Sequence, residues 1–251
     1  MIRVVILGSG NVAQHFIRAF GRASGVDLLK VWARHPQDLS HLLAADKITS
    51  SLEELPMADV YIISVLDDAI AGLSAALPFA NRLVVHTSGT KSIDEIRGAN
   101  RSGVFYPLQT FSKTRLVDYS QIPFCLEADS GDIDLLKKLA ATVSSHIYEM
   151  DSDRRKTLHV AAVFVSNFVN HLYVAAKEIA AQKQIPFDVL KPLIMETAAK
   201  VQTLDPRLAQ TGPAIRRDQG TVAAHLEYLK DSPYALLYQI ITQSIQHEQK
   251  L

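Results

Sequence analysis

The sequence predicts an α/β protein in which a doubly wound, mostly parallel sheet is followed by an all-helical domain. Strand and helix patterns alternate over residues 1–150, which is typical of a parallel sheet covered by helices. No strand pattern follows residue 151, and residues 153–181 contain neither glycine nor proline. We therefore expect two domains, over residues 1–150 and 151–251.

The predicted strands are short apolar runs bounded by turns or polar residues. They cover residues 3–7, 28–33, 60–66, 83–86, 104–105 and 124–127. Helical spacing of apolar residues falls between them, over residues 12–23, 69–77, 93–97 and 133–143. Further helices are predicted over residues 153–181, 187–204, 219–229 and 233–249. Ser232 and Pro233 supply an N-cap and a first-turn proline for the last of these.

The composition excludes several classes of protein. The 251 residues carry 26 Lys plus Arg and 26 Asp plus Glu, so no net charge attracts nucleic acid or an anionic membrane. The single cysteine, Cys125, excludes an intrachain disulfide and a multi-cysteine metal site, and no histidines pair at metal-ligand spacing. No apolar run approaches the roughly 20 residues that span a bilayer. We expect a cytoplasmic protein without a bound metal.

The most specific motif joins the first strand to the first helix. It reads G-x-G-x-x-A over Gly8, Ser9, Gly10, Asn11, Val12 and Ala13. Gly8 permits a tight turn, Gly10 lets a pyrophosphate approach the backbone, and Ala13 lets the helix pack closely on the strand. The N–H groups at the helix start then face the anion. The motif predicts dinucleotide binding, and a glycine turn in a fold that binds no nucleotide is the alternative.

The end of the second strand distinguishes the two nicotinamide dinucleotides. An acidic residue there would bind the ribose 2′-hydroxyl of NAD, whereas this chain has Arg34. An arginine can pair with a 2′-phosphate and stack on adenine, which favours NADP(H) over NAD(H). A surface arginine in a loop is the alternative.

Short polar residues follow later strands, and ligands bind at the carboxyl ends of strands in open α/β sheets. Val65, Thr87 and Ser88 are therefore predicted to contact the cofactor, although an ordinary turn would also explain the last two. Gln109 follows another strand end and is predicted to contact the substrate. Asp67 and Asp68 are expected to cap the next helix rather than to take part in chemistry.

The predicted helix over residues 153–181 carries an unusual polar stripe. At 100° per residue, the stripe lies within about 60° of His159. Its members are Lys156, His159, Ser166, Asn170, Tyr173 and Lys177, with Asn167 at the edge. The other faces are nearly all apolar, so we expect a largely buried helix whose stripe lines a cleft. A solvated face or a subunit interface is the alternative.

Three residues of this helix are candidate catalytic residues. His159 is the candidate proton donor, because a histidine changes its charge near neutral pH. Asn167 and Asn170 would orient the substrate.

A Gly-Pro turn precedes two arginines in the helical part. Thr211 and Gly212 open this loop, and Arg216 and Arg217 offer hydrogen-bond donors to an anion at a helix start. Asp218 is expected to cap that helix. These residues are candidate contacts for an anionic substrate, and an ordinary turn between helices is the alternative.

Five segments together resemble a family of uncharacterised bacterial proteins. They read GSGNVA, HTSG, PLQTF, LHVAAVFVSNFVNHLY and QTGPAIRRD, and the last two, Leu158–Tyr173 and Gln210–Asp218, are the most specific. The family pairs a Rossmann-like domain with a helical domain named DUF2520, and the resemblance covers nearly the whole chain.

The layout is also distantly similar to pyrroline-5-carboxylate reductase, the F420-dependent NADP reductases and the 6-phosphogluconate and β-hydroxyacid dehydrogenases. This similarity implies that NAD(P)H binds to the first domain, that the substrate lies between the two domains, and that the helical domain builds a dimer.

No catalytic residue carries over cleanly from those enzymes. The β-hydroxyacid dehydrogenases have a lysine four residues before an asparagine on the long helix, and here Val163 stands four residues before Asn167. The catalytic histidine of the similar 3-hydroxyacyl-CoA dehydrogenases would fall near Gly103, and members of the present family often have a histidine where this chain has Tyr106.

The sequence therefore predicts an NADP(H)-dependent oxidoreductase that transfers hydride to or from a small, anionic carbonyl or imine compound. Hydride chemistry belongs to the cofactor, so the protein must orient both reactants and move a proton. The missing lysine leaves open a non-catalytic dinucleotide sensor or partner-binding protein. A nearly all-round apolar helix in a domain of roughly 100 residues needs further packing partners, so we expect a homodimer.

Overall fold

The computed structural model describes residues 1–112 and 115–248. The chain divides into two compact units, Met1–Asn167 and Phe168–Leu251. The last strand in the described chain ends at Glu149, and helices follow it. The boundary between the compact units lies further along, inside the long helix, because the start of that helix packs on the sheet through Leu158.

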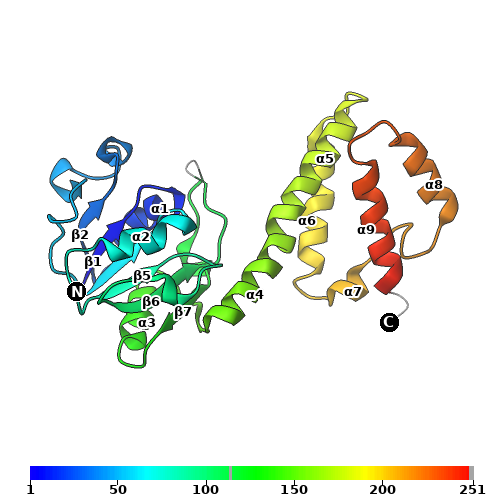
Figure 1. Ribbon diagram of the computed structural model, residues 1–251. Coiled ribbons are helices and arrows are strands. Elements are labelled where there is room, and N and C mark those ends of the chain that lie inside the picture. Colours follow the sequence, from blue (N-terminus) through cyan, green and yellow to red (C-terminus); the bar gives the residue numbers. More distant parts are fainter. Residues whose placement is uncertain (113–114, 249–251) are drawn as a thin grey trace. The chain divides into compact units, whose positions relative to one another are not determined.

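An eight-stranded sheet forms the centre of the first unit (Figure 1). Its strands are β1 (Ile2–Leu7), β2 (Val26–Trp32), β3 (Ile48–Thr49), β4 (Val60–Ile63), β5 (Leu83–His86), β6 (Arg101–Pro107), β7 (Phe124–Ala128) and β8 (Ile147–Glu149). They lie in the order β3-β2-β1-β4-β5-β6-β7-β8, and the β6–β7 pair is antiparallel while the other pairs are parallel. The predicted doubly wound, mostly parallel sheet is confirmed. The strand order reverses between β1 and β4, which is where such sheets bind ligands.

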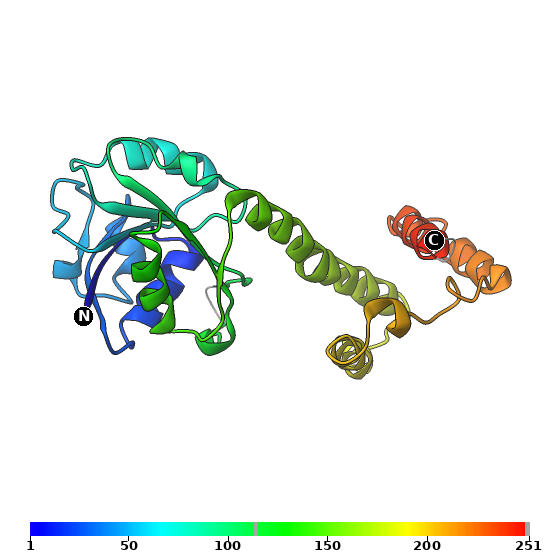
Figure 2. The ribbon, with the colours of Figure 1, turned by 90° about the horizontal axis from the view of Figure 1, so that it is seen from below.

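Helices cover both faces of this sheet (Figures 1 and 2). They are α1 (Asn11–Phe20), α2 (Ile70–Ala75) and α3 (Ile133–Ala141). Alternate residues of β1 show why both faces need cover, because neighbouring side chains of a strand point to opposite faces. Val4 and Ile6 pack in one cluster with α1 and α3, and Val5 and Leu7 pack in another with Ile70 of α2.

The rest of the described chain is helical. It comprises α4 (Ser152–Ala162), a π-helical turn (Val163–Phe168), α5 (Val169–Ala181), α6 (Lys191–Lys200), α7 (Pro206–Ala209), α8 (Gln219–Tyr228) and α9 (Ala235–Glu248). Asp151 caps α4 by accepting the Arg154 N–H at 2.8 Å. Asp218 caps α8 by accepting the Thr221 N–H at 3.0 Å, as predicted.

The long helix formed by α4, the π turn and α5 differs from its prediction. It is largely exposed, because its buried residues in the described chain are Ser152, Arg155 and Ala175, while Val165 is 75% exposed. Its i→i+5 turn also breaks the 3.6-residue spacing, so the angular position predicted for Asn170 from a constant 100° step does not hold.

The same helix bears on the expected absence of a membrane span. By length and composition only, Ser152–Ala181 is long and apolar enough to cross a membrane, with a mean hydropathy of 1.3 in its most apolar window. The prediction that no segment approaches this length was therefore wrong.

The remaining differences concern short elements and element ends. Two-, three- and four-residue elements such as β3, β8 and α7 carry no usable periodicity and were not predicted. The helix predicted over residues 93–97 is a three-residue turn. The last helix begins at Ala235, although Ser232 Oγ does accept the Tyr234 N–H at 3.2 Å. Gln249, its predicted end, lies outside the described residues.

Candidate functional site

A cavity of about 600 Å³ opens at the carboxyl ends of the parallel strands of the first unit. Most of the residues that the sequence assigns to the cofactor line it. Those residues, with the predicted Gln109 and His159, are Gly8, Ser9, Gly10, Asn11, Val12, Arg34, Val65, Thr87, Ser88, Gln109 and His159. Ala13 is fully buried beneath them, where it packs with α1 against the sheet.

The other predicted site residues lie elsewhere. Asn167 lines a groove of about 390 Å³ that shares Tyr106, Gln109 and His159 with the cavity. The second unit contains Asn170, Thr211, Gly212, Arg216 and Arg217.

The two glycines of the first turn are needed for different reasons. Gly8 has φ +141°, and a Cβ there would lie 2.0 Å from the Ser64 carbonyl oxygen, so the fold itself requires glycine. Gly10 has φ −70°, and a Cβ there would meet no atom of residues 1–112 or 115–248 within 4 Å. No side chain caps α1, which leaves its N-terminus available to an anion. Gly10 therefore faces the cavity, and the fold itself would tolerate a side chain at this position.

The end of the cavity beyond β2 carries both signs of charge. Arg34 lines it and is exposed, and His35 and Asp38 line it as well. In folds of this type the residue at this strand end contacts the adenosine ribose. Arg34 can bind a 2′-phosphate there, whereas Asp38 is the nearby carboxylate that such a phosphate would avoid.

Neither Asp67 nor Asp68 caps a helix, so the expected capping role was wrong. The turn that Asp67 begins has no side-chain cap. The Asp67 carboxylate instead accepts hydrogen bonds from Ser88 Oγ at 2.9 Å and Thr90 Oγ1 at 2.6 Å. Ser88 Oγ also accepts the N–H groups of Thr90 and Lys91, both at 3.1 Å. Asp67 therefore fixes the loop after β5 against the end of β4.

A tyrosine–histidine contact closes one side of the cavity. The Tyr106 hydroxyl lies 3.1 Å from His159 Nδ1, and both side chains line the cavity as well as the groove. Burial raises the pKa of Tyr106 to about 12, so its hydroxyl keeps its proton at neutral pH. The sequence singled out His159 but not Tyr106. The available signal was the position of Tyr106 at the carboxyl end of a strand.

Comparison with known proteins identifies the family. Residues 122–245 match the model of a family described as a domain of unknown function, DUF2520. The chain is 40% identical to BF3122 from Bacteroides fragilis, which carries the provisional name NADP oxidoreductase, and the match covers 98% of both chains with a TM-score of 0.88. The protein belongs to the DUF2520 family.

More distant structures share the fold. TM1727 from Thermotoga maritima is 22% identical over 97% of this chain and 98% of that chain, with a TM-score of 0.81. An imine reductase from Pseudomonas sp. is 13% identical over 99% of this chain and 94% of that chain, with a TM-score of 0.72. A search of curated protein sequences found no match. The architecture of this DUF2520 protein is thus a Rossmann unit followed by a helical unit like that of the imine reductase.

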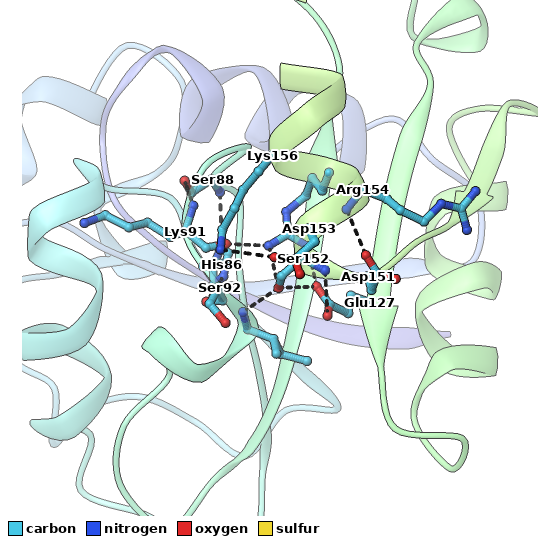
Figure 3. Close-up of polar contacts among 12 residues, drawn as sticks. His86, Ser88, Lys91, Ser92, Glu127, Asp151, Ser152, Asp153, Arg154 and Lys156 are labelled. Carbon is cyan, nitrogen blue, oxygen red and sulfur yellow. Dashed lines mark hydrogen bonds and ion pairs between the residues drawn. The ribbon is translucent and has the colours of Figure 1, made fainter. Parts of the chain in front are cut away.

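A buried polar cluster holds α4 of this DUF2520 protein against the sheet (Figure 3). Arg155 is 0% exposed, and its guanidinium donates to the Glu127 carboxylate, to the Lys91 carbonyl oxygen and to Ser152 Oγ. Glu127 also accepts the N–H and the hydroxyl of Ser152 at 3.0 and 2.8 Å. One cation thus joins the first turn of α4, strand β7 and the loop after β5.

His86 lies beside this cluster and is fixed in one tautomer. Its Nδ1 accepts the Ser88 N–H at 3.2 Å, so its Nε2 carries the hydrogen and donates to the Ser92 carbonyl oxygen at 3.0 Å. Burial and, to a smaller extent, the neighbouring Arg155 cation lower the pKa of His86 to about 4, against the opposing effects of its hydrogen bond to the Ser92 carbonyl oxygen and of the Asp67 carboxylate. His86 is therefore neutral and structural at neutral pH.

The residues predicted to bind an anion in the loop over residues 211–217 do not line one common pocket within the second unit. Gly212 and Arg217 take left-handed backbone conformations, with φ of +106° and +54°. Thr211 lines an apolar groove of about 330 Å³, whereas Arg217 lines a different pocket with Gln243. Arg216 is exposed.

Proposed function

We propose that this protein is an NADP(H)-dependent oxidoreductase that transfers hydride to or from a small carbonyl or imine compound. One observation carries the proposal: a single cavity brings together an open glycine turn, the Arg34 cation and the Tyr106–His159 contact. The provisional name of BF3122, which is 40% identical, supports the same conclusion.

The residues that line the cavity fit a dinucleotide. The pyrophosphate would bind at Gly10 and the uncapped start of α1, and Arg34 would hold a 2′-phosphate. Thr87 and Ser88 would contact the nicotinamide ribose from the loop that Asp67 fixes. When bound, NADP(H) supplies or accepts the hydride.

The chain's own task in the reaction is to place the substrate and to move a proton. His159 would hold the proton, and Asn167 in the adjoining groove would orient the substrate together with Gln109. We also propose that Asn170 orients the substrate. The proposed contacts for an anionic part of the substrate are Thr211, Gly212, Arg216 and Arg217.

Calorimetric titration with NADPH and NADH tests cofactor binding. Gly10→Ala should leave the fold as stable as before, or more stable by about 0.4–1 kcal/mol, because its backbone suits alanine. The added methyl group should nevertheless weaken NADPH binding by about tenfold or more, roughly 1.4 kcal/mol. Arg34→Asp should weaken the binding of NADPH more than that of NADH. The absence of heat with both nucleotides would overturn the proposal.

A second experiment separates an enzyme from a binding protein. NADPH oxidation is measured at high enzyme concentration against a panel of small keto acids and cyclic imines. Turnover of a panel member supports the oxidoreductase. Tight NADPH binding without turnover of any member would instead support a non-catalytic dinucleotide sensor, the alternative that the missing lysine leaves open.

We further propose that the protein is a cytoplasmic homodimer that associates through its helical unit. Among the described residues of that unit, the buried apolar side chains are Ala175, Ala214, Val222 and Leu229. A core of this size is too small to stabilise a domain of this length. A second copy would cover the exposed apolar residues of the helices. These residues would then be shielded from water by protein and not by a membrane.

A further inference from the structure

The Tyr106–His159 pair is in direct contact with the backbone of the loop after β5. A Cβ at Gly89 would lie 2.5 Å from His159 Nδ1, 2.8 Å from Tyr106 Cζ and 2.9 Å from the Tyr106 hydroxyl oxygen. Gly89 itself lines the cavity. The two bonded atoms of the pair, Nδ1 and the hydroxyl oxygen, therefore lie on the side of the pair that faces the cavity wall at Gly89.

The pair also stands where two hollows of the first unit meet. The cavity carries the glycine turn, and the groove beyond the pair is lined by Leu158, Ala162, Ser166 and Asn167 among others. The described lining of the groove contains no Asp, Glu, Lys or Arg. On the groove side of the pair, a reacting atom would thus meet the phenol and the imidazole and no permanently charged side chain.

We propose that Tyr106 is the residue that protonates the substrate and that His159 resupplies its proton, so that the two act as one unit. This rests on the proposed function, because it assigns a role within the same reaction. His159 Nδ1 is occupied by its contact with the Tyr106 oxygen, so a proton on Nδ1 passes to Tyr106 and not directly to the substrate.

The proton and electron balance of the step is simple. Bound NADPH would supply the hydride to the carbon of the C=O or C=N bond and would leave as NADP+, and the π electron pair moves to the oxygen or nitrogen. The O–H bond of Tyr106 breaks, and its proton bonds to that atom. The tyrosinate then takes the proton that His159 holds on Nδ1, and His159 regains a proton from the solvent, so that the whole reduction consumes one hydride and one solvent proton. Because burial raises the pKa of Tyr106, its hydroxyl starts the step protonated.

The first variant is Tyr106→Phe, which removes one oxygen atom, and the chain supplies a matched control. Tyr119 makes a similar contact, with its hydroxyl 2.9 Å from His15 Nδ1, but it does not line the cavity. Turnover is measured with the best substrate of the panel, and NADPH affinity by calorimetry. Tyr106→Phe should lower kcat by roughly 10²–10⁴-fold at unchanged NADPH affinity, and Tyr119→Phe should change neither by more than about twofold.

A spectroscopic measurement on the protein without cofactor tests the pair itself. The ring ¹⁵N signals of His159, assigned with His159→Asn, should shift in Tyr106→Phe and in Gly89→Ala but not in Tyr119→Phe. Unchanged His159 signals in Tyr106→Phe would show that the contact is absent in solution and would overturn the proposal.

The remaining outcomes separate this proposal from the function on which it rests. If the native protein turns over a substrate and Tyr106→Phe keeps its kcat within about threefold, Tyr106 is not the proton donor and the oxidoreductase stands. If the native protein turns over no substrate, the proposed function fails and this role fails with it.

Discussion

At the residue scale, the role of a side chain can depend on contacts that its neighbours in sequence do not reveal. Gly8, Gly10 and Arg34 could be placed from the sequence, because a strand, a glycine turn and a strand end are local signals. Tyr106 and Arg155 could not. Tyr106 does stand at a strand end, but the partners of the two residues lie 53 and 28 residues away in the chain, so neither contact can be inferred from nearby sequence.

His86 gives a pH-dependent stability. Its pKa is about 4 in the folded protein and about 6.5 in the unfolded chain, so between these values the unfolded chain binds a proton that the folded chain does not. Its contribution is complete above pH 6.5 and is lost as the pH falls toward 4, by up to about 3 kcal/mol. Urea unfolding of the native protein and of His86→Gln at pH 7, 6 and 5 measures this.

The informative quantity is the difference between the two unfolding free energies. His86→Gln should be less stable at pH 7, because glutamine replaces the contacts to Ser88 and Ser92 imperfectly. That difference should shrink as the pH falls. A difference that stays constant from pH 7 to pH 5 would contradict the assignment of a buried neutral imidazole.

At the element scale, the attachment of α4 to the sheet depends on one buried ion pair. Arg155→Ala leaves the Glu127 carboxylate and the Lys91 carbonyl oxygen without their partner. We expect a loss of about 3–5 kcal/mol in the free energy of unfolding of the first unit. Denaturant unfolding measures it. Lys137→Ala, which breaks an exposed ion pair to Glu149, is the control and should cost no more than about 1 kcal/mol.

The comparison between those two variants decides the result. Similar losses for Arg155→Ala and Lys137→Ala would mean that the cluster does not hold the helix. A loss confined to Arg155→Ala would show that α4 depends on the sheet unit for its position, and with it His159 one turn later.

The sequence predicted the long helix but not the π-helical turn within it. Residues 152–181 are helical almost as predicted, because they lack glycine and proline. The π turn at Val163–Phe168 leaves no compositional mark, and its effect on spacing is therefore invisible in the sequence. The antiparallel turn from β6 to β7 was equally hidden, since strand direction depends on the connection and not on the strand residues.

At the scale of the whole molecule, the distribution of buried apolar surface is uneven. The first unit has two extended clusters on the two faces of its sheet. In the second unit, large apolar side chains such as Leu193, Met195 and Ile240 are 64%, 69% and 54% exposed. The sequence indicated that this part needs further packing partners and that its long helix is largely buried, whereas a single chain leaves that helix largely exposed.

Self-association gives the corresponding prediction. Light scattering at micromolar concentration should give twice the 27.7 kDa mass of one chain. Ile240→Lys, which places a charge on the exposed face of α9, should shift the protein toward the monomer. Met57→Lys, at a residue that is 61% exposed in the first unit, is the control and should leave the mass unchanged. A monomeric native protein would count against the dimer.

The two glycines of the first turn are subject to different constraints on their replacement during evolution. Any side chain at position 8 would collide with the backbone beyond β4, so a descendant of this protein would keep Gly8 whether or not it still bound a nucleotide. Position 10 has no such protection, because no atom of the described residues would oppose a side chain there. A lineage that gave up the cofactor would be free to replace Gly10 first. The residue at position 10 is therefore the place to look when asking which members of the family still use a dinucleotide.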